Sequence, residues 1–194
     1  MPRNIFTQRK KSVLGKIDKS FKGDWDKKII SLCKKINSMK NYYTTSSCSG
    51  RIVLIIDKDK KQKGLFLKVY HNKITFKKLK RDLREIVERE IVEKSIVKFK
   101  QEPCILHIVC KTLKNAETIL KKAHLAGWKK SGILSIAKNR IIVELNGTDR
   151  LEFLILNKRK ILVTGEFLEL IVKKSNENLE KSWEKIEKLK DLLK

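Results

Sequence analysis

Apolar residues recur along this chain with two spacings, one typical of helices and one typical of strands. The helical spacing predicts helices over residues 5–20, 25–39, 77–93, 114–126 and from Glu166 to the C-terminus. Asp24 is placed to cap the second of these helices, and Gly127 is placed to end the fourth. The last helix is the longest, with Leu168, Trp183 and Ile186 among its expected core contacts.

Shorter apolar runs predict strands over residues 51–57, 65–71, 95–100, 103–110, 131–137, 140–146 and 151–156. The run from Ile52 to Ile56 is continuous, which is typical of a strand buried on both faces. Alternation places Ile105, His107 and Val109 on one face of their strand. Short turns join the strands, so the pattern predicts an α+β fold with a largely antiparallel sheet flanked by helices. We expect residues 1–194 to form a single domain.

The charge of the chain points to a polyanionic partner. Lys and Arg number 47 against 22 Asp and Glu, a net charge of +25. Residues 1–80 hold 22 of the basic side chains and only 5 of the acidic ones. Such a field attracts nucleic acid or an anionic membrane surface. Lysines that only keep the protein soluble are the alternative for any single Lys, but the asymmetry favours a binding surface in the N-terminal part.

Several classes of protein are disfavoured. No apolar run is long enough to span a bilayer, and the N-terminus has no apolar stretch typical of a secretory signal, so we expect no membrane partner. The four Cys form no CxxC pair, so we expect no metal site and reduced thiols in a cytoplasmic protein. The chain has neither GxGxxG nor GxxxxGK[ST], which argues against a Rossmann or P-loop nucleotide site.

The segment TTSSCSGR, residues 44–51, is unusually rich in small hydroxyl side chains. We expect a loop that grips a polar small molecule, with Arg51 matching a carboxylate or phosphate. A turn held by local Ser and Thr hydrogen bonds is the alternative. Cys48 is a candidate nucleophile beside Arg51, or else a small buried residue.

A second group of candidate residues carries ionisable side chains. His107 lies between apolar neighbours, so it is either a core histidine or, if this sheet face is open, a proton acceptor near neutral pH. Glu102 starts the same strand, where a solvated carboxylate is the ordinary outcome. Asp18, Lys22 and Asp26 surround one turn, where helix capping is the alternative.

These segments together resemble one enzyme family. DKSFKGDWD, NYYTTSSCSGRI, a strand ending in His71, EPCILHIVC and SGI occur in the order seen in the wybutosine-synthesising methyltransferases, the third enzyme family of the wybutosine pathway in tRNA. SSCSGR with a downstream EPxxxH is the specific pair, and the resemblance covers nearly the whole chain. Lys100 and Gln101 depart from the family pattern, because they separate Phe99 from Glu102. The chain looks like an archaeal member.

The resemblance implies an S-adenosylmethionine-dependent tRNA methyltransferase with a non-Rossmann α+β fold. Family members methylate the N4 position of a tricyclic wyosine-type guanosine at position 37, beside the anticodon of phenylalanine tRNA. Binding of S-adenosylmethionine is implied for Ser46, Ser47, Cys48, Gly50 and Arg51. Substrate binding is implied for Lys22, His71 and Ser131, and catalysis for His107, Glu102 and Asp18. The other matching positions are Ser20, Gly23, Asp26, Thr45, Pro103 and Gly132.

Methyl transfer from a sulfonium depends mostly on positioning, and the attacking nitrogen must lose a proton. We hypothesise that His107 accepts this proton and that Glu102 or Asp18 orients its ring. Two other classes remain alternatives, a non-catalytic RNA-binding module and a hydrolase or transferase that uses Cys48.

Overall fold

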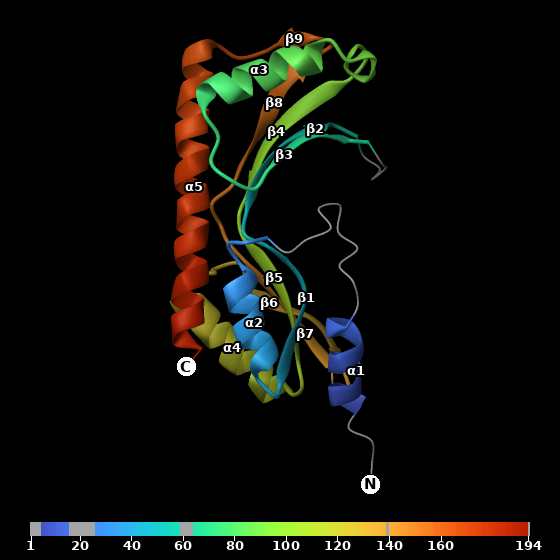
Figure 1. Ribbon diagram of the computed structural model, residues 1–194, viewed down its shortest axis with the longest axis vertical. Coiled ribbons are helices and arrows are strands. Elements are labelled where there is room, and N and C mark those ends of the chain that lie inside the picture. The colour runs from blue at the N-terminus through green and yellow to red at the C-terminus, as the bar shows by residue number, and fades with distance from the viewer. Residues whose placement is uncertain (1–4, 16–25, 59–63, 139, 194) are drawn as a thin grey trace. The chain divides into compact units, whose positions relative to one another are not determined.

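The computed structural model describes residues 5–15, 26–58, 64–138 and 140–193 (Figure 1). The helices of this part are α1 (Ile5–Leu14), α2 (Ile30–Ser38), α3 (Phe76–Val87), α4 (Leu113–Leu125) and α5 (Gly165–Leu192), with a 3-10 helix at Glu90–Val92. Thr75 and Thr112 cap α3 and α4, since each hydroxyl accepts a hydrogen bond from the backbone N–H three residues later. The predicted long C-terminal helix is confirmed.

The strands form two sheets. They are β1 (Tyr42–Cys48), β2 (Arg51–Ile56), β3 (Phe66–Tyr70), β4 (Ile96–Glu102), β5 (Ile105–Cys110), β6 (Gly132–Ala137), β7 (Arg140–Asn146), β8 (Leu151–Asn157) and β9 (Lys160–Ile161). One sheet has the order β1-β5-β7-β6 and the other has the order β3-β2-β4-β8-β9. Every pairing described is antiparallel, which confirms the predicted fold class.

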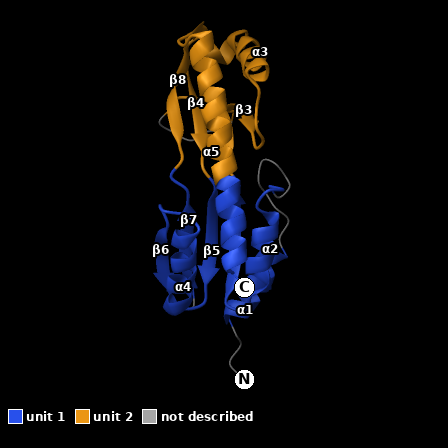
Figure 2. Ribbon diagram, turned by 90° about the vertical axis from the view of Figure 1, so that its left-hand side faces the viewer, with its two compact units in different colours: residues 1–49, 104–148, 182–194 blue, residues 50–103, 149–181 orange. Residues whose placement is uncertain are grey.

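The chain folds into two compact units, coloured separately in Figure 2. Unit 1 comprises residues 1–49, 104–148 and 182–194, and unit 2 comprises residues 50–103 and 149–181. Each unit contains one of the two sheets, and α5 contributes residues to both units. The interpretation of residues 1–194 as a single domain stays a prediction.

One face of the unit 1 sheet is packed against helices. The buried side chains of this cluster come from α2, α4, α5 and the central strands and include Ile36, Leu106, Ile119, Val143 and Ile186. Trp128 is fully buried among them. Its indole N–H donates to the backbone carbonyl of Lys185 at 3.1 Å, so the polar edge of this large ring is satisfied.

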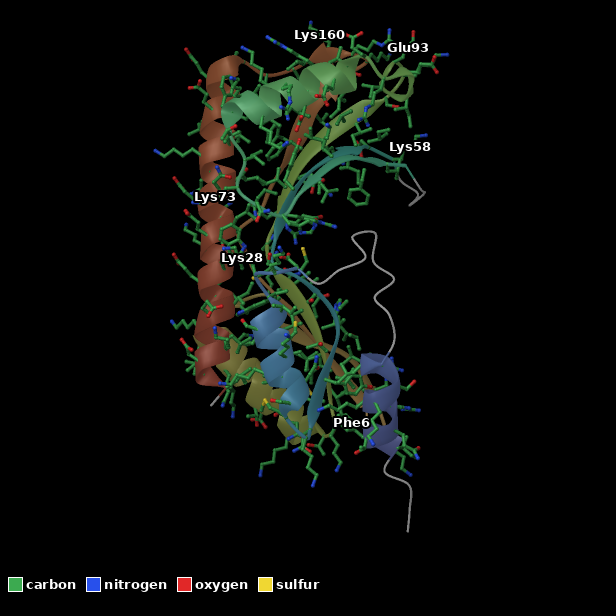
Figure 3. The ribbon with its side chains drawn as sticks, in the orientation of Figure 1. Phe6, Lys28, Lys58, Lys73, Glu93 and Lys160 are labelled. Atoms are coloured by element: carbon green, nitrogen blue, oxygen red, sulfur yellow. The ribbon has the colours of Figure 1, made fainter. Side chains whose placement is uncertain are left out.

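The opposite face of this sheet carries a smaller apolar cluster at one end. Phe6 of α1, labelled in Figure 3, packs against Tyr43 and Val109, with the Phe6 and Tyr43 ring centroids 5.3 Å apart. Farther along the same two strands the side chains become polar and partly exposed, beginning with Ser46 and His107. This polar half of the face contains the candidate site.

The unit 2 sheet packs its apolar face against side chains of α3 and α5. Phe99 stacks on Phe153 with the ring centroids 5.1 Å apart, and Phe153 meets the edge of Phe167 at 5.3 Å. Leu79 and Leu83 of α3 are fully buried, as their helical spacing predicts. The aromatic contacts attach the start of α5 to β4 and β8.

Helix α3 also buries a carboxylate. The Asp82 side chain is 1% exposed and accepts a hydrogen bond from the Tyr70 hydroxyl at 2.6 Å. Lys68, Lys78 and Arg81 surround it with positive charge at 3.4 to 3.6 Å. Burial alone would raise the pKa of Asp82, but the Tyr70 hydrogen bond and these cations outweigh burial and hold that pKa below its ordinary value. Burial and the nearby Asp82 raise the pKa of Tyr70.

Most predicted elements are confirmed. The helix predicted over 77–93 ends at Val87, with a 3-10 helix after it. Of the helix predicted over 5–20, α1 ends at Leu14, and residues 16–20 lie outside the described residues. Three further corrections follow. Helix α2 begins later than predicted, at Ile30, and its N-cap makes no side-chain hydrogen bond. The predicted cap, Asp24, lies outside the described residues. The short strand Lys160–Ile161 was not predicted, because two residues carry no periodicity.

The third correction concerns the hydroxyl-rich segment. Residues 44–51 were expected to form a loop, but most of them belong to strand β1. Tyr42, Tyr43 and the two Thr that follow favour a strand, and β1 pairs along its whole length with β5. Only Ser49 and Gly50 separate β1 from β2. In the described residues, no helix is both long and apolar enough to cross a membrane.

Candidate functional site

Three polar side chains from neighbouring strands meet on the partly exposed face of the unit 1 sheet. The register places Ser46 of β1 opposite His107 of β5, and His107 opposite Glu144 of β7. Ser46 Oγ lies 2.5 Å from His107 Nδ1, and Glu144 Oε2 lies 2.8 Å from His107 Nε2. Both nitrogens of the imidazole are therefore hydrogen-bonded. We call this arrangement the Ser46–His107–Glu144 cluster.

The partners of His107 determine where its proton lies. A carboxylate only accepts hydrogen bonds, so Nε2 of a neutral His107 ring carries the proton and donates to Glu144. The Nδ1 lone pair then accepts the hydrogen bond from the Ser46 hydroxyl. His107 is thus held as a base at Nδ1, with a carboxylate behind it to stabilise the positive charge that a second proton would bring.

A bulge in β1 brings Ser46 to this position. The register shifts between Thr44 and Ser46, so Thr45 is an extra residue in the strand. With regular pairing, Thr45 would stand opposite His107, and every later side chain of β1 would change face. Bulges commonly redirect a side chain next to a functional site. The bulge at Thr45 therefore puts Ser46, and not Thr45, beside His107.

The space beside Glu144 is open. Glu144 pairs with Gly132 of β6, the glycine that follows Ser131. A Cβ atom added at Gly132 would meet no other atom within 4 Å. The side chains of His107 and Glu144 are 26% and 27% exposed. The cluster is therefore sheltered enough to be ordered and accessible enough to meet a substrate.

The turn after β1 is held by a buried carboxylate. Asp26 Oδ2 accepts hydrogen bonds from the Ser49 backbone N–H at 2.9 Å and from the Ser49 hydroxyl at 2.6 Å. Ser49 is fully buried and Asp26 is 7% exposed. Gly50 follows with φ of +103°, a conformation that other residues rarely adopt. Asp26 thus orients this turn, and Ser49, to which the sequence analysis gave no role, is its partner.

In unit 2, Arg51 and Glu102 form an ion pair across β2 and β4. Arg51 Nε lies 2.6 Å from Glu102 Oε2, with the two side chains 32% and 35% exposed. The guanidinium also lies over the Phe66 ring, 5.3 Å from its centroid. The pairing of β2 with β4 is regular throughout, so Lys100 and Gln101 are accommodated within the strand without a bulge.

This ion pair changes the expected partner of His107. The sequence analysis expected Glu102 or Asp18 to orient the ring, but the strand register places Glu102 opposite Arg51. The carboxylate hydrogen-bonded to His107 is that of Glu144. The sequence analysis gave Glu144 no role. Its place between Val143 and Leu145, both buried, is the signal that could have found it, since alternation puts Glu144 on the face opposite the core.

The predicted substrate-binding residues lie in different settings. The Ser131 hydroxyl donates to the Trp128 carbonyl at 2.7 Å and accepts from the Asn146 N–H at 3.2 Å, so it connects the start of β6 with the end of β7. His71 directly follows β3 in unit 2 and is partly exposed. Lys22 and the other matching positions Asp18, Ser20 and Gly23 lie outside the described residues.

The described cysteines are all free thiols. Burial raises the pKa of Cys33 to about 11 and the pKa values of Cys104 and Cys110 to about 12. These three thiols therefore stay protonated at neutral pH and are poor nucleophiles. Cys48, at the end of β1, is partly exposed.

The chain as a whole is similar in sequence to known proteins. Residues 8–194 match the family described as Methyltransferase TYW3. A Thermococcus sibiricus protein named tRNA(Phe) 7-((3-amino-3-carboxypropyl)-4-demethylwyosine(37)-N(4))-methyltransferase is 34% identical over 191 residues, which cover 97% of this chain and 94% of that protein. The tRNA wybutosine-synthesizing protein 3 homolog of Danio rerio is 34% identical over 200 residues, covering 100% of this chain and 76% of that protein.

The fold is also similar to that of a solved structure. The PH1069 protein from Pyrococcus horikoshii superimposes with a TM-score of 0.86 at 31% sequence identity, covering 97% of this chain and 96% of that one. The family match over nearly the whole sequence and the shared fold lead to one conclusion. This chain belongs to the methyltransferase TYW3 family.

Proposed function

We propose that this protein methylates the N4 position of a tricyclic wyosine-type guanosine at position 37 of phenylalanine tRNA, with S-adenosylmethionine as the methyl donor. Family membership implies methyl transfer, and the names of relatives give the base and the tRNA. The observation in the structure that supports the proposal is the Ser46–His107–Glu144 cluster. It contains a base, His107 Nδ1, in contact with the exposed Ser46 hydroxyl, and deprotonation of a ring nitrogen requires such a base.

The residues assigned to the cofactor suit a donor that carries a carboxylate. S-adenosylmethionine supplies an electrophilic methyl group when it is bound. Arg51 uses Nε for Glu102, and a guanidinium has further donors on its two Nη atoms, which suit a second carboxylate. Ser47, Cys48 and Gly50 would supply backbone and side-chain polar groups along the same stretch of chain. Cys48 forms no covalent bond in this scheme, so we expect Cys48→Ser to retain most activity.

His107 would accept the proton that leaves N4. Its Nδ1 atom takes the proton, either directly or through the Ser46 hydroxyl, which then passes its own proton to Nδ1. The resulting imidazolium faces the Glu144 carboxylate at 2.8 Å, which stabilises the new charge. Ser46, assigned to the cofactor by resemblance, would thus lie where it also contacts the base.

The substrate base lies in the anticodon loop, where a single strand can present it to a pocket without opening a duplex. We assign substrate contacts to Lys22, His71 and Ser131, as the family motifs imply. The remaining catalytic assignments, Asp18 and Glu102, rest on the same resemblance. The positive charge of the chain would hold the phosphates of the tRNA, so binding should weaken steeply as salt is added.

The proposal is tested by analysing the nucleosides of a treated tRNA. The purified protein and S-adenosylmethionine are incubated with tRNA from cells that lack this enzyme, and the digested nucleosides are weighed by mass spectrometry. We expect a gain of one methyl group on the tricyclic base at position 37. The matched control is His107→Ala, which should leave the base largely unmethylated. A folded wild-type protein that adds no methyl group to a confirmed substrate would overturn the proposal and favour a non-catalytic RNA-binding module.

A further inference from the structure

We infer that Glu144 is a positioning residue that holds His107 in the tautomer needed for proton abstraction. This inference deepens the proposed function and rests on it. Glu144 acts on the reaction through His107, because its carboxylate lies 2.8 Å from Nε2, the ring nitrogen on the opposite side from Ser46.

The first argument is geometric. Glu144, His107 and Ser46 lie on three adjacent strands, at directly paired register positions, on one sheet face. Val143 and Leu145, on either side of Glu144, are fully buried in the core on the other face. Because these neighbours anchor the backbone of β7, the Glu144 side chain starts from a fixed position directly opposite His107. An ion pair between two fully exposed side chains would orient the ring less strongly.

The second argument concerns the proton. A free imidazole exchanges between two neutral tautomers, and only the tautomer with the proton on Nε2 has a lone pair on Nδ1. The Ser46 hydroxyl imposes no choice by itself, since it both donates and accepts hydrogen bonds. The Glu144 carboxylate only accepts, so it alone selects the tautomer that leaves Nδ1 as the base.

Methyl transfer leaves a positive charge on His107. The N4 lone pair forms the new bond to carbon, the bond between that carbon and sulfur breaks, and its electron pair stays on sulfur as a thioether. The N4 proton ends on Nδ1 of His107, giving an imidazolium beside the Glu144 carboxylate. No oxidant or reductant is needed. Removing the charge of Glu144 should therefore slow the reaction without changing what the protein binds.

Glu144→Gln tests the inference, because it removes the charge with almost no change of shape. We expect kcat to fall about 10-fold or more, while the Kd for S-adenosylmethionine and the KM for tRNA stay within about 2-fold. The matched control is Glu152→Gln in β8 of unit 2, a carboxylate that pairs with Lys98 and Lys100. This variant should leave kcat unchanged.

A second readout does not depend on activity. The chain has only three His, so ¹⁵N-histidine NMR can assign His107 by comparison with His71 and His124 variants. We expect the wild type and Ser46→Ala to show His107 protonated on Nε2, and Glu144→Gln to show a mixture of tautomers. If Glu144→Gln changes neither the tautomer of His107 nor kcat, the positioning role of Glu144 is overturned. Methylation by the wild type would still support the proposed function in that case. A wild type without methylation would overturn the proposed function, and a tautomer shift in Glu144→Gln would still support the action of Glu144 on His107.

Discussion

The two sheets of this protein each bury one face and keep polar side chains on the other, but they use those polar faces differently. On the unit 1 sheet, Ser46, His107 and Glu144 form a continuous hydrogen-bonded row around one imidazole. On the unit 2 sheet, basic and acidic side chains neutralise one another in pairs such as Arg51–Glu102 and Lys98–Asp57. The unit 1 row is built around an imidazole, which is a base, whereas a carboxylate paired with a cation resists protonation.

From this difference we expect the proton acceptor to lie in unit 1, whereas most charged side chains on the unit 2 sheet neutralise one another. The unit 2 pairs and its buried Asp82 satisfy charges within the fold, and we propose that the remaining donors of Arg51 meet a ligand. Unit 1 also holds more of the positive charge, with 24 basic and 8 acidic side chains against 23 and 14 in unit 2. Each prediction below tests one side of this division.

The largest effect is expected from His107→Ala in unit 1. Removing the base should lower kcat by about 100-fold to 10,000-fold, the usual contribution of general base catalysis. The Kd for S-adenosylmethionine, measured by calorimetry, should stay within about 2-fold, because the imidazole acts on the substrate nitrogen. Equal activity in wild type and variant would remove the functional difference between the two sheets.

The next effect is on stability and belongs to unit 2. Asp82→Asn should lower the free energy of unfolding by about 2–4 kcal/mol at pH 7, because it leaves Tyr70, Lys68 and Lys78 without their buried carboxylate. The pKa of Asp82 is lower in the folded state, so its contribution is present above pH 4 and is lost as the pH falls further. Chemical denaturation at several pH values should show the free energies of unfolding of wild type and variant converging in acid. A difference that stays constant with pH would contradict a stabilising role of the ionised Asp82 carboxylate.

Arg51→Ala tests whether the guanidinium of Arg51, besides pairing with Glu102, binds S-adenosylmethionine. Loss of a charge-assisted contact should weaken S-adenosylmethionine binding by about 10-fold to 100-fold in calorimetry. Lys98→Ala, which breaks the ion pair with Asp57 on the same sheet, is the matched control and should change the affinity little. If both variants bind the cofactor like the wild type, Arg51 is structural like its neighbours.

The smallest effect is expected from surface lysines. The double variant Lys34→Gln and Lys40→Gln removes two exposed charges of unit 1, and Lys77→Gln with Arg84→Gln removes two from unit 2. The unit 1 pair should weaken tRNA binding a few-fold and reduce the salt dependence by up to about 2 in the log–log slope. The unit 2 pair should change the slope less, and the reverse order would show that unit 2 carries the phosphate contacts.

The local elements of the fold could be predicted because they follow local patterns. The apolar periodicity of 77–93 and 114–126 led to α3 and α4, and Gly127, with φ of +93°, ends the latter as expected. The hydroxyl-rich segment was placed in a loop, because serines are rare in strands. Pairing with β5 along its whole length overrides that preference, and this partner lies about 60 residues away in the sequence.

The candidate site was predictable only in part. The resemblance indicated Ser46 and His107, and strand alternation grouped His107 with Ile105 and Val109 but left open whether their face forms the core. Alternation between buried Val143 and Leu145 puts Glu144 on the face opposite the core, but the same kind of alternation also applies to Glu102 in β4. Glu144 becomes special only when β7 pairs with β5 in a register that places it against Nε2.

The class of fold, most of the helices and strands, the positive charge and the family could all be read from the sequence alone. These follow from periodicity, composition and motifs, which act over short distances along the chain. The tertiary structure decided which carboxylate meets which cation or base. Glu102 pairs with Arg51 and Glu144 with His107 because strand register is a long-range property, set by the packing of whole faces, and one residue of slip would exchange every partner.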